Sequence, residues 1–121
     1  TYVYASREDH IVPWHSAYQS TQILKGPIRF VMGASGHIAG VINPPHKKKR
    51  NYWTNSQLPK KSEQWLKGAE EIAGSWWPDY SEWLTQYAGK KVAAPSEYGG
   101  GKHKKLVAAP GTYVKEKAQK V

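Results

Sequence analysis

Two side chains that together could perform acid–base chemistry follow two apolar segments of this sequence. Asp9 comes just after residues 2–5, and His37 comes just after residues 28–33. A carboxylate that accepts a hydrogen bond from an imidazole fixes the histidine tautomer and leaves the other ring nitrogen free as a base. Taken singly, such an aspartate is often only a turn or capping residue, and a histidine among glycines is often only a turn residue. Taken together, at matching strand ends, they favour an acid–histidine pair.

The elements that must position this pair lie within residues 1–43. Residues 2–5 and 28–33 have strand-like composition. Between them, Pro13 suits the first turn of a helix, and Gly26 and Pro27 suit its end. One helical face carries Trp14, Ala17, Tyr18 and Leu24. A strand–helix–strand unit makes the strands parallel through a right-handed crossover, so their carboxyl ends share one edge of a sheet. We therefore expect Asp9 and His37 to meet.

The glycines that surround the histidine are the second feature of this turn. Gly33, Gly36 and Gly40 are expected to permit a tight turn and the close approach of a substrate.

The remainder of the chain divides by composition into three segments. Residues 44–61 are predicted to be a basic loop, and residues 62–89 a tryptophan-rich pair of helices. The first of these helices is expected to run through Trp65, Ala69, Ile72 and Ala73 to Gly74. Residues 90–121 are predicted to be a basic, extended tail. The expected class is α/β, with a parallel βαβ unit followed by two helices and this tail.

Composition excludes several kinds of site. The 121 residues include no cysteine, so they can hold no disulfide, no thiolate metal site and no nucleophilic thiol. No leader and no apolar run of transmembrane length is evident, which favours a cytoplasmic protein. The net charge of +9 favours anionic partners. Because the chain begins with Thr1 and goes straight into a strand, we expect it to be a piece of a longer protein.

Two long segments around the candidate pair resemble a known family. "YVYASREDHIVPW" and "FVMGASGHIAGVINPP" resemble the acid and histidine segments of the class I polyhydroxyalkanoate synthases, and the likeness continues through "KRNYWTN", "GSWWPDYSEWL" and "APGTYVKEKA". The resemblance covers essentially the whole chain and implies the C-terminal portion of an α/β-hydrolase fold. It places the family's catalytic aspartate at Asp9 and its catalytic histidine at His37.

The resemblance also implies an activity. These enzymes are acyltransferases that polymerise 3-hydroxyacyl-coenzyme A into polyester, release coenzyme A and use a Cys-His-Asp triad. The coenzyme A thioester is a substrate, so no cofactor and no metal are expected. The family's nucleophilic cysteine lies in a G-x-C-x-G elbow, which would have to precede Thr1, so these residues alone should be inactive. Whether Asp9 only orients His37 or also assists deprotonation of the substrate hydroxyl stays open.

The partners that the resemblance implies are the acyl-coenzyme A, the growing polyester and the surface of polyhydroxyalkanoate granules in the cytoplasm. It further implies a homodimer in the full-length enzyme, and neither nucleic acid nor a transmembrane segment is expected.

Further candidate residues have a weaker basis. His10 would point away from Asp9, since neighbours in an extended stretch alternate, and it could form a pocket wall. A basic run could contact the phosphates of coenzyme A, although a solvated loop is the commoner role for such a run. It comprises Lys47, Lys48, Lys49 and Arg50.

Two other readings remain open. The first is another enzyme of the α/β-hydrolase fold, such as a depolymerase, lipase or thioesterase. The second is a small basic nucleic-acid-binding module, favoured by charge and by aromatics in "NYW" and "SWWPDY". The basic residues, however, form short loop and tail clusters instead of a helix face, and no recognised nucleic-acid motif is present. The synthase reading is therefore preferred.

Overall fold

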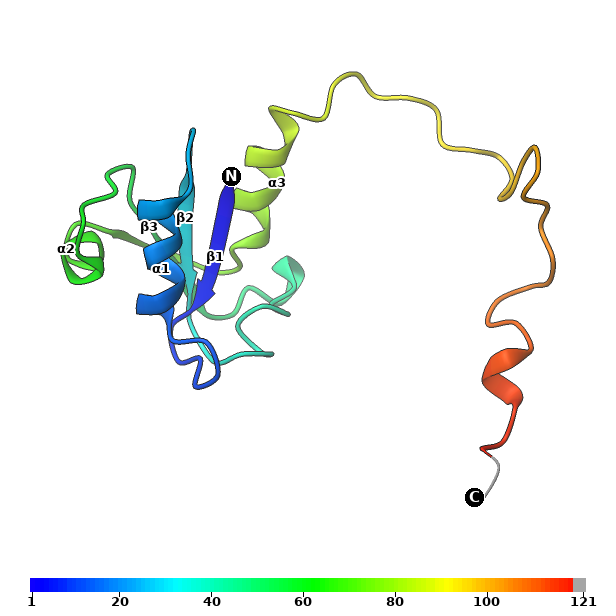
Figure 1. Cartoon of the computed structure of the whole chain (residues 1–121), viewed down its shortest axis with the longest axis horizontal. Coiled ribbons are helices and arrows are strands. Elements are labelled where there is room, and N and C mark those ends of the chain that lie inside the picture. The colour runs from blue at the N-terminus through cyan, green and yellow to red at the C-terminus, as the bar shows by residue number, and fades with distance from the viewer. Residues whose placement is uncertain (119–121) are drawn as a thin grey trace. The chain divides into compact units, whose positions relative to one another are not determined.

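The computed structural model describes residues 1–118 and divides the chain into two compact units. The first comprises residues 1–89, and the second begins at Lys90. The first unit is a small α/β domain built on a mixed four-stranded sheet with the strand order β1-β2-β3-β4 (Figure 1).

The predicted strand–helix–strand unit is confirmed. It consists of β1 (Tyr2–Ser6), α1 (Trp14–Ile23) and β2 (Arg29–Gly33). The two strands are parallel, with Ser6 opposite Gly33 at their carboxyl ends. Helix α1 ends one residue before Leu24, which is exposed and does not belong to the buried helix face that its spacing predicted.

The loop expected over residues 44–61 contains a strand. After a short 3-10 helix, η1 (Pro45–Lys47), strand β3 (Asn51–Thr54) pairs antiparallel with β2. The expectation was wrong because lysines and prolines flank the short run "NYWT" and hide its period-2 pattern. Its central residues Tyr52 and Trp53 are both buried, on opposite faces of the sheet.

The first of the two late helices is much shorter than predicted. Helix α2 (Ser62–Lys67) ends at Gly68, and the next residues form strand β4 (Glu70–Ala73), which pairs with β3. The spacing of Trp65, Ala69 and Ile72 fits a helix, but pairing with the open edge of β3 satisfies the backbone of residues 70–73 instead. The second predicted helix is present as α3 (Trp77–Thr85), with Pro78 in its first turn.

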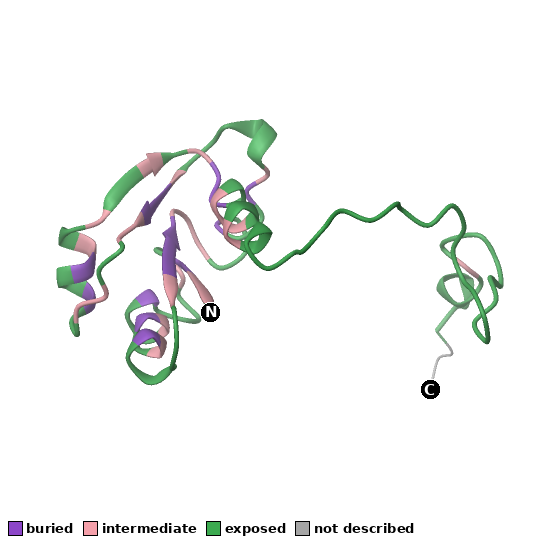
Figure 2. Cartoon of the chain, turned by 90° about the horizontal axis from the view of Figure 1, so that it is seen from above, coloured by how far each residue is buried: buried purple, intermediate pink, exposed green. Residues whose placement is uncertain are grey.

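The helices cover both faces of the sheet, and alternation along β2 shows which residues face which layer. Phe30 and Met32 pack with Tyr18 of α1 and Trp65 of α2, whereas Val31 packs on the other face with Trp76, which directly precedes α3. Most of the buried apolar side chains of this core are aromatic, and Figure 2 shows that buried residues lie on strands as well as on helices. Such a core holds the carboxyl ends of β1 and β2 at fixed positions.

The second unit has little regular structure within its described residues. It contains an isolated bridge between Gly100 and His103 and the short 3-10 helix η2 (Tyr113–Lys115), and nearly all of its side chains are exposed. The extended tail predicted over residues 90–121 includes residues 119–121, which lie outside the described part. Across residues 1–118, none of the helices has the length and apolar character that crossing a membrane requires.

Candidate catalytic site

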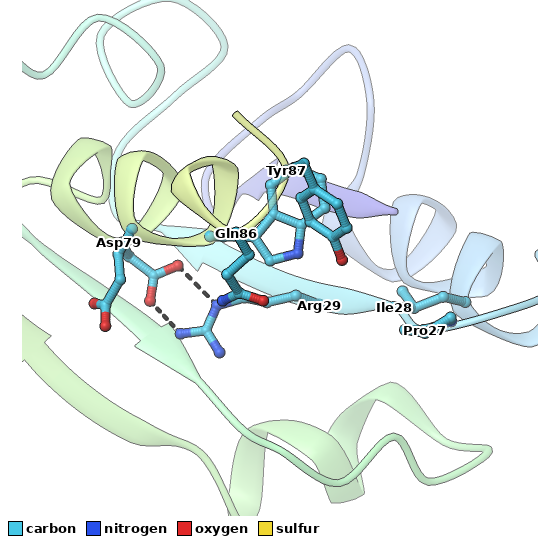
Figure 3. Close-up of a pocket in the computed structure, with 8 residues that line it drawn as sticks. Pro27, Ile28, Arg29, Asp79, Gln86 and Tyr87 are labelled. Carbon is cyan, nitrogen blue, oxygen red and sulfur yellow. Dashed lines mark hydrogen bonds and ion pairs between the residues drawn. The ribbon is translucent and has the colours of Figure 1, made fainter. Parts of the chain in front are cut away.

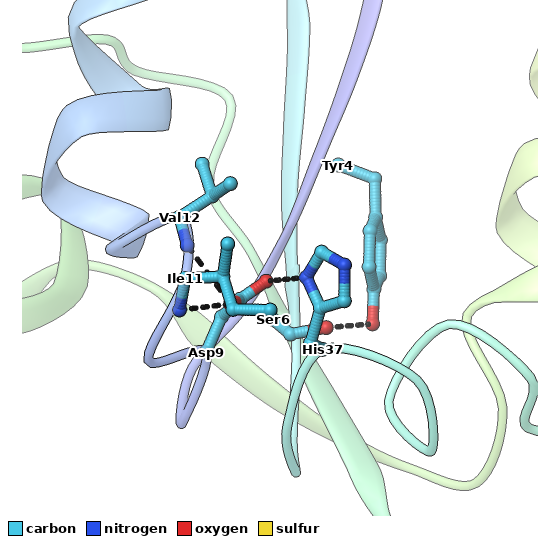
Figure 4. A network of polar contacts seen from close by, with 6 residues as sticks. All are labelled: Tyr4, Ser6, Asp9, Ile11, Val12 and His37. Carbon is cyan, nitrogen blue, oxygen red and sulfur yellow. Dashed lines mark hydrogen bonds and ion pairs between the residues drawn. The ribbon is translucent and has the colours of Figure 1, made fainter.

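Asp9 and His37 lie in hydrogen-bonding contact at the carboxyl edge of the parallel strands. Asp9 is in the turn after β1 and His37 is in the turn after β2. His37 Nδ1 is 2.8 Å from Asp9 Oδ2, although 28 positions separate the two residues (Figure 4). The predicted contact is therefore confirmed, and the catalytic role of the pair stays a prediction.

Asp9 is anchored through both of its carboxylate oxygens. Oδ1 accepts hydrogen bonds from the backbone N–H groups of Ile11 and Val12, each at 2.9 Å, while Oδ2 accepts from His37. The side chain is 8% exposed. These hydrogen bonds, led by that from Val12, lower the pKa of Asp9 to about 2 despite the opposing effect of desolvation. Asp9 therefore serves as turn residue and as histidine partner at once, and its carboxylate is ionised at neutral pH.

The contact with Asp9 determines which nitrogen of His37 is available. An ionised carboxylate can only accept, so Nδ1 must donate, and the neutral imidazole then carries its lone pair on Nε2. The side chain is 44% exposed, and among residues 1–118 Nε2 has no hydrogen-bond partner. The turn that carries His37 is unusual, because Ser35 adopts a left-handed conformation with φ of 79°. The arrangement is that of an oriented base with an accessible nitrogen.

Two of the three glycines near His37 make room for side chains of β1. A Cβ atom on Gly33 would lie 2.2 Å from the hydroxyl oxygen of Tyr4, and one on Gly40 would lie 2.6 Å from Ser6 Oγ. At Gly36 the nearest atom would be 3.5 Å away, which is an ordinary contact. At Gly33 and Gly40 the missing Cβ therefore makes room for side chains of the protein itself, where the sequence analysis expected room for a substrate.

The pair lines a pocket of about 210 Å³. Its polar groups are the side chains of Asp9, His37, Tyr4 and Ser6. Its apolar lining comes from Ala5, Val12, Ala17 and Val41. Tyr4 and Ser6 are site residues that the sequence reasoning missed. The signal was present, since alternation along "YVYAS" places both on one face of β1 at the edge where Asp9 follows.

The other predicted site residues do not line this pocket. His10 is exposed and makes no side-chain hydrogen bond within the described residues. The four basic residues, 47–50, are also exposed, and Lys48 lines a separate pocket of about 450 Å³ beside Tyr52 and Ser75. Burial raises the pKa of Tyr4, and the positive charge of the nearby Arg50 offsets part of this rise. Within residues 1–118 no group of three or more metal-ligating side chains comes together.

A second carboxylate of low exposure lies at the opposite, amino edge of the same strands. Asp79 of α3 accepts a hydrogen bond through Oδ1 from Tyr2 Oη at 2.8 Å. It also accepts two from the Arg29 guanidinium, through Oδ1 from Nε at 2.8 Å and through Oδ2 from the other arm (Figure 3). Desolvation raises the pKa of Tyr2, and the bond to Asp79 raises it further. A pocket of about 340 Å³ adjoins this cluster. The cluster ties α3 to the sheet.

Comparisons with known proteins identify relatives along nearly the whole chain. It is 60% identical over 118 residues to the poly(3-hydroxyalkanoate) polymerase subunit PhaC of Cupriavidus necator, which is 98% of this chain and 20% of that protein. It is 42% identical over 114 residues to poly(3-hydroxyalkanoate) polymerase 2 of Ectopseudomonas oleovorans, which is 94% of this chain and 20% of that protein. It is also 42% identical over 116 residues to the poly(3-hydroxyalkanoate) polymerase subunit PhaC of Rhizobium etli, which is 96% of this chain and 18% of that protein. No family model matches the chain.

The matched relatives agree in what they are called, and the chain spans about a fifth of their length. The resemblance indicated by the acid and histidine segments is thus confirmed: over almost all of its residues, this chain corresponds to the C-terminal part of the poly(3-hydroxyalkanoate) polymerases.

Proposed function

We propose that these residues supply the aspartate and the histidine of a Cys-His-Asp triad in a polyhydroxyalkanoate synthase. The single observation that carries the proposal is the 2.8 Å contact between His37 Nδ1 and Asp9 Oδ2, which leaves Nε2 exposed as a base. The names of the relatives support the reaction class, which is transfer of a 3-hydroxyacyl group from coenzyme A to a growing polyester chain. On this proposal the coenzyme A thioester is the substrate and no cofactor is needed.

The nucleophile of this triad must come from outside residues 1–121, because they contain no cysteine. We place it on the remaining strands of an α/β-hydrolase fold, of which β1 and β2 would be members. Residues 1–121 by themselves should then release no coenzyme A.

In the first half of the reaction, His37 Nε2 takes the proton of the cysteine thiol, and the thiolate attacks the carbonyl carbon of the thioester. A carbon–sulfur bond to the enzyme forms, the bond to coenzyme A breaks, and the leaving sulfur receives the proton from His37. Asp9 stabilises the imidazolium formed in between, since its carboxylate is ionised and already bonded to Nδ1.

In the second half, a 3-hydroxyl oxygen attacks the carbonyl carbon of an acyl thioester. A carbon–oxygen ester bond forms, the carbon–sulfur bond of that thioester breaks, and the leaving sulfur receives the hydroxyl proton, so the chain grows by one unit. His37 is the base for this hydroxyl as well, because its side chain lines the same pocket. We assign Asp9 the orienting role, since both of its oxygens already accept hydrogen bonds from the protein.

The remaining parts of the proposal concern surroundings and partners. The exposed run from Lys47 to Arg50 would attract the phosphates of coenzyme A, and His10 would border the entrance. We further propose a cytoplasmic enzyme located at polyhydroxyalkanoate granules and active as a homodimer.

The test is an assay of the full-length protein with 3-hydroxybutyryl-coenzyme A. We expect release of free thiol together with an insoluble polyester. Thiol release without polymer would identify a thioesterase or other hydrolase of the same fold, and no thiol release would refute the proposed reaction.

A further inference from the structure

The pocket that holds Asp9 and His37 contains a third polar group, the hydroxyl of Tyr4. Alternation along β1 places Tyr4 and Ser6 on the same face of the sheet, and their hydroxyl oxygens lie 3.3 Å apart beside the imidazole (Figure 4). This distance is long for an O–H···O hydrogen bond, for which 2.7–2.8 Å is usual, so the contact is a weak one. Ser6 therefore does not fully use the hydrogen-bonding capacity of the phenol.

The surrounding structure fixes the phenol ring in place. On one side the ring stacks on Trp76, with centroids 4.2 Å apart and planes at 29°. On the other side it depends on the absence of a side chain at Gly33, where a Cβ would come within 2.2 Å of the hydroxyl oxygen and 2.8 Å of the ring carbon that bears it. Gly33 has an ordinary φ, so this glycine is required for space and not for its backbone conformation.

The hydroxyl stays protonated in this setting. Burial raises the pKa of Tyr4, and this outweighs the opposing effects of Ser6 and of the charge on Arg50. The group is thus a neutral O–H donor in a partly desolvated pocket, where a hydrogen bond to developing negative charge is stronger than in water. His37 cannot provide such a donor while it acts as a base.

We propose that Tyr4 is a further catalytic residue, whose hydroxyl donates a hydrogen bond to the carbonyl oxygen of the acyl thioester as nucleophilic attack places negative charge on that oxygen. This inference rests on the proposed function. No proton is transferred by Tyr4: the carbon–oxygen double bond opens to an alkoxide as the new carbon–sulfur bond forms, and it closes again when coenzyme A leaves. Proton transfer remains with His37.

The test compares Tyr4→Phe with wild type in the full-length protein assayed with 3-hydroxybutyryl-coenzyme A. Phenylalanine keeps the ring, its stacking on Trp76 and the space over Gly33, and removes only the hydroxyl. We expect kcat to fall by about 10- to 100-fold with KM within about twofold, because the bond strengthens in the transition state. Tyr98→Phe, at an exposed position in the second unit, is the matched control and should keep wild-type rates.

Ser6→Ala distinguishes catalysis from a structural role. It removes the partner of the Tyr4 hydroxyl and leaves the phenol in place, so its loss in kcat should be clearly smaller than that of Tyr4→Phe. Three results would each overturn the assignment: Tyr4→Phe at wild-type kcat, a change confined to KM, or an equal loss in Ser6→Ala. If His37→Ala is also fully active, the proposed function itself fails, whereas an inactive His37→Ala beside an active Tyr4→Phe refutes only the role of Tyr4.

Discussion

The molecule holds two aspartates of low side-chain exposure at opposite ends of the same pair of strands, and they differ in one respect that matters. Asp9 at the carboxyl edge and Asp79 at the amino edge have side chains that are 8% and 9% exposed. Each accepts hydrogen bonds through both oxygens, and each binds a nitrogen-bearing side chain on or just after β2. Low exposure of the carboxylate, and hydrogen bonds to both of its oxygens, therefore do not distinguish a candidate site from a structural contact.

The partner is what distinguishes them. Arg29 is permanently charged, so a proton can neither enter nor leave its contact with Asp79, and a fork of two hydrogen bonds fixes its geometry. His37 forms one hydrogen bond with Asp9 and presents a second nitrogen that can take a proton. The comparison predicts that variants at the carboxyl edge lose activity while variants at the amino edge lose stability.

The largest effect is expected for His37→Ala in the full-length protein. Loss of the base should lower kcat for thiol release by about 10⁶-fold, as removal of a triad histidine does in other enzymes. The thermal unfolding midpoint should hardly change, because the side chain is nearly half exposed. His103→Ala in the second unit is the control and should retain wild-type activity. A His37→Ala variant with more than a tenth of wild-type kcat would remove the basis of the comparison.

A somewhat smaller loss, about 10⁴-fold in kcat, is expected for Asp9→Asn. The amide oxygen can still accept from Ile11 and Val12, so the turn should keep its shape. The amide nitrogen, however, would donate towards Nδ1 and favour the tautomer whose proton sits on Nε2. Nitrogen chemical shifts of His37 measure the tautomer directly. Unchanged shifts with unchanged kcat would show that the carboxylate only caps its turn.

The sequence predicted this carboxyl edge well, because the contact depends on local features. Two short apolar strands, one amphipathic helix and a Gly-Pro stop define a βαβ unit, and the right-handed crossover then brings Asp9 and His37 to one edge. The amino edge was not predicted. Arg29 and Asp79 are 50 positions apart, and their contact depends on how α3 packs against the sheet. No local sequence pattern predicts that packing.

The half of the sheet formed by β3 and β4 shows a different reason for failure. Each strand has four residues, which is too short for its pattern to outweigh its neighbours, and residues 70–73 fit a helix as well as a strand. Their structure is decided by the open edge that β2 offers to β3 and β3 then offers to β4. The sequence also could not predict that Gly33 leaves room for the Tyr4 ring, because this contact depends on the distance between neighbouring strands.

At the amino edge, Asp79→Asn should destabilise the protein and leave its chemistry almost intact. The substitution leaves Arg29 without its charged partner, and loss of one member of a buried ion pair costs about 3–5 kcal/mol. Because the Arg29 side chain is 39% exposed to solvent, we expect about 1–3 kcal/mol, measured as the loss in unfolding free energy with urea. The value of kcat at a temperature where the variant is folded should stay within about threefold. A kcat loss as large as that of Asp9→Asn would show that the two edges are coupled.

The smallest expected effect is a dependence of protein stability on pH, which arises from Asp9 at the carboxyl edge. The pKa of Asp9 is lowered from its ordinary value of 3.8 to about 2, so the stabilising effect of its ionised form is complete above about pH 4 and is lost as the pH falls towards 2. The difference in unfolding midpoint between wild type and Asp9→Asn should therefore not shrink between pH 8 and pH 5, and should shrink only between pH 4 and pH 2. A loss of kcat on acidification above pH 4 must then come from another group. If the difference in midpoint is close to zero at pH 5 and changes little down to pH 2, the backbone and histidine hydrogen bonds stabilise the ionised form of Asp9 less than their 2.8–2.9 Å lengths indicate.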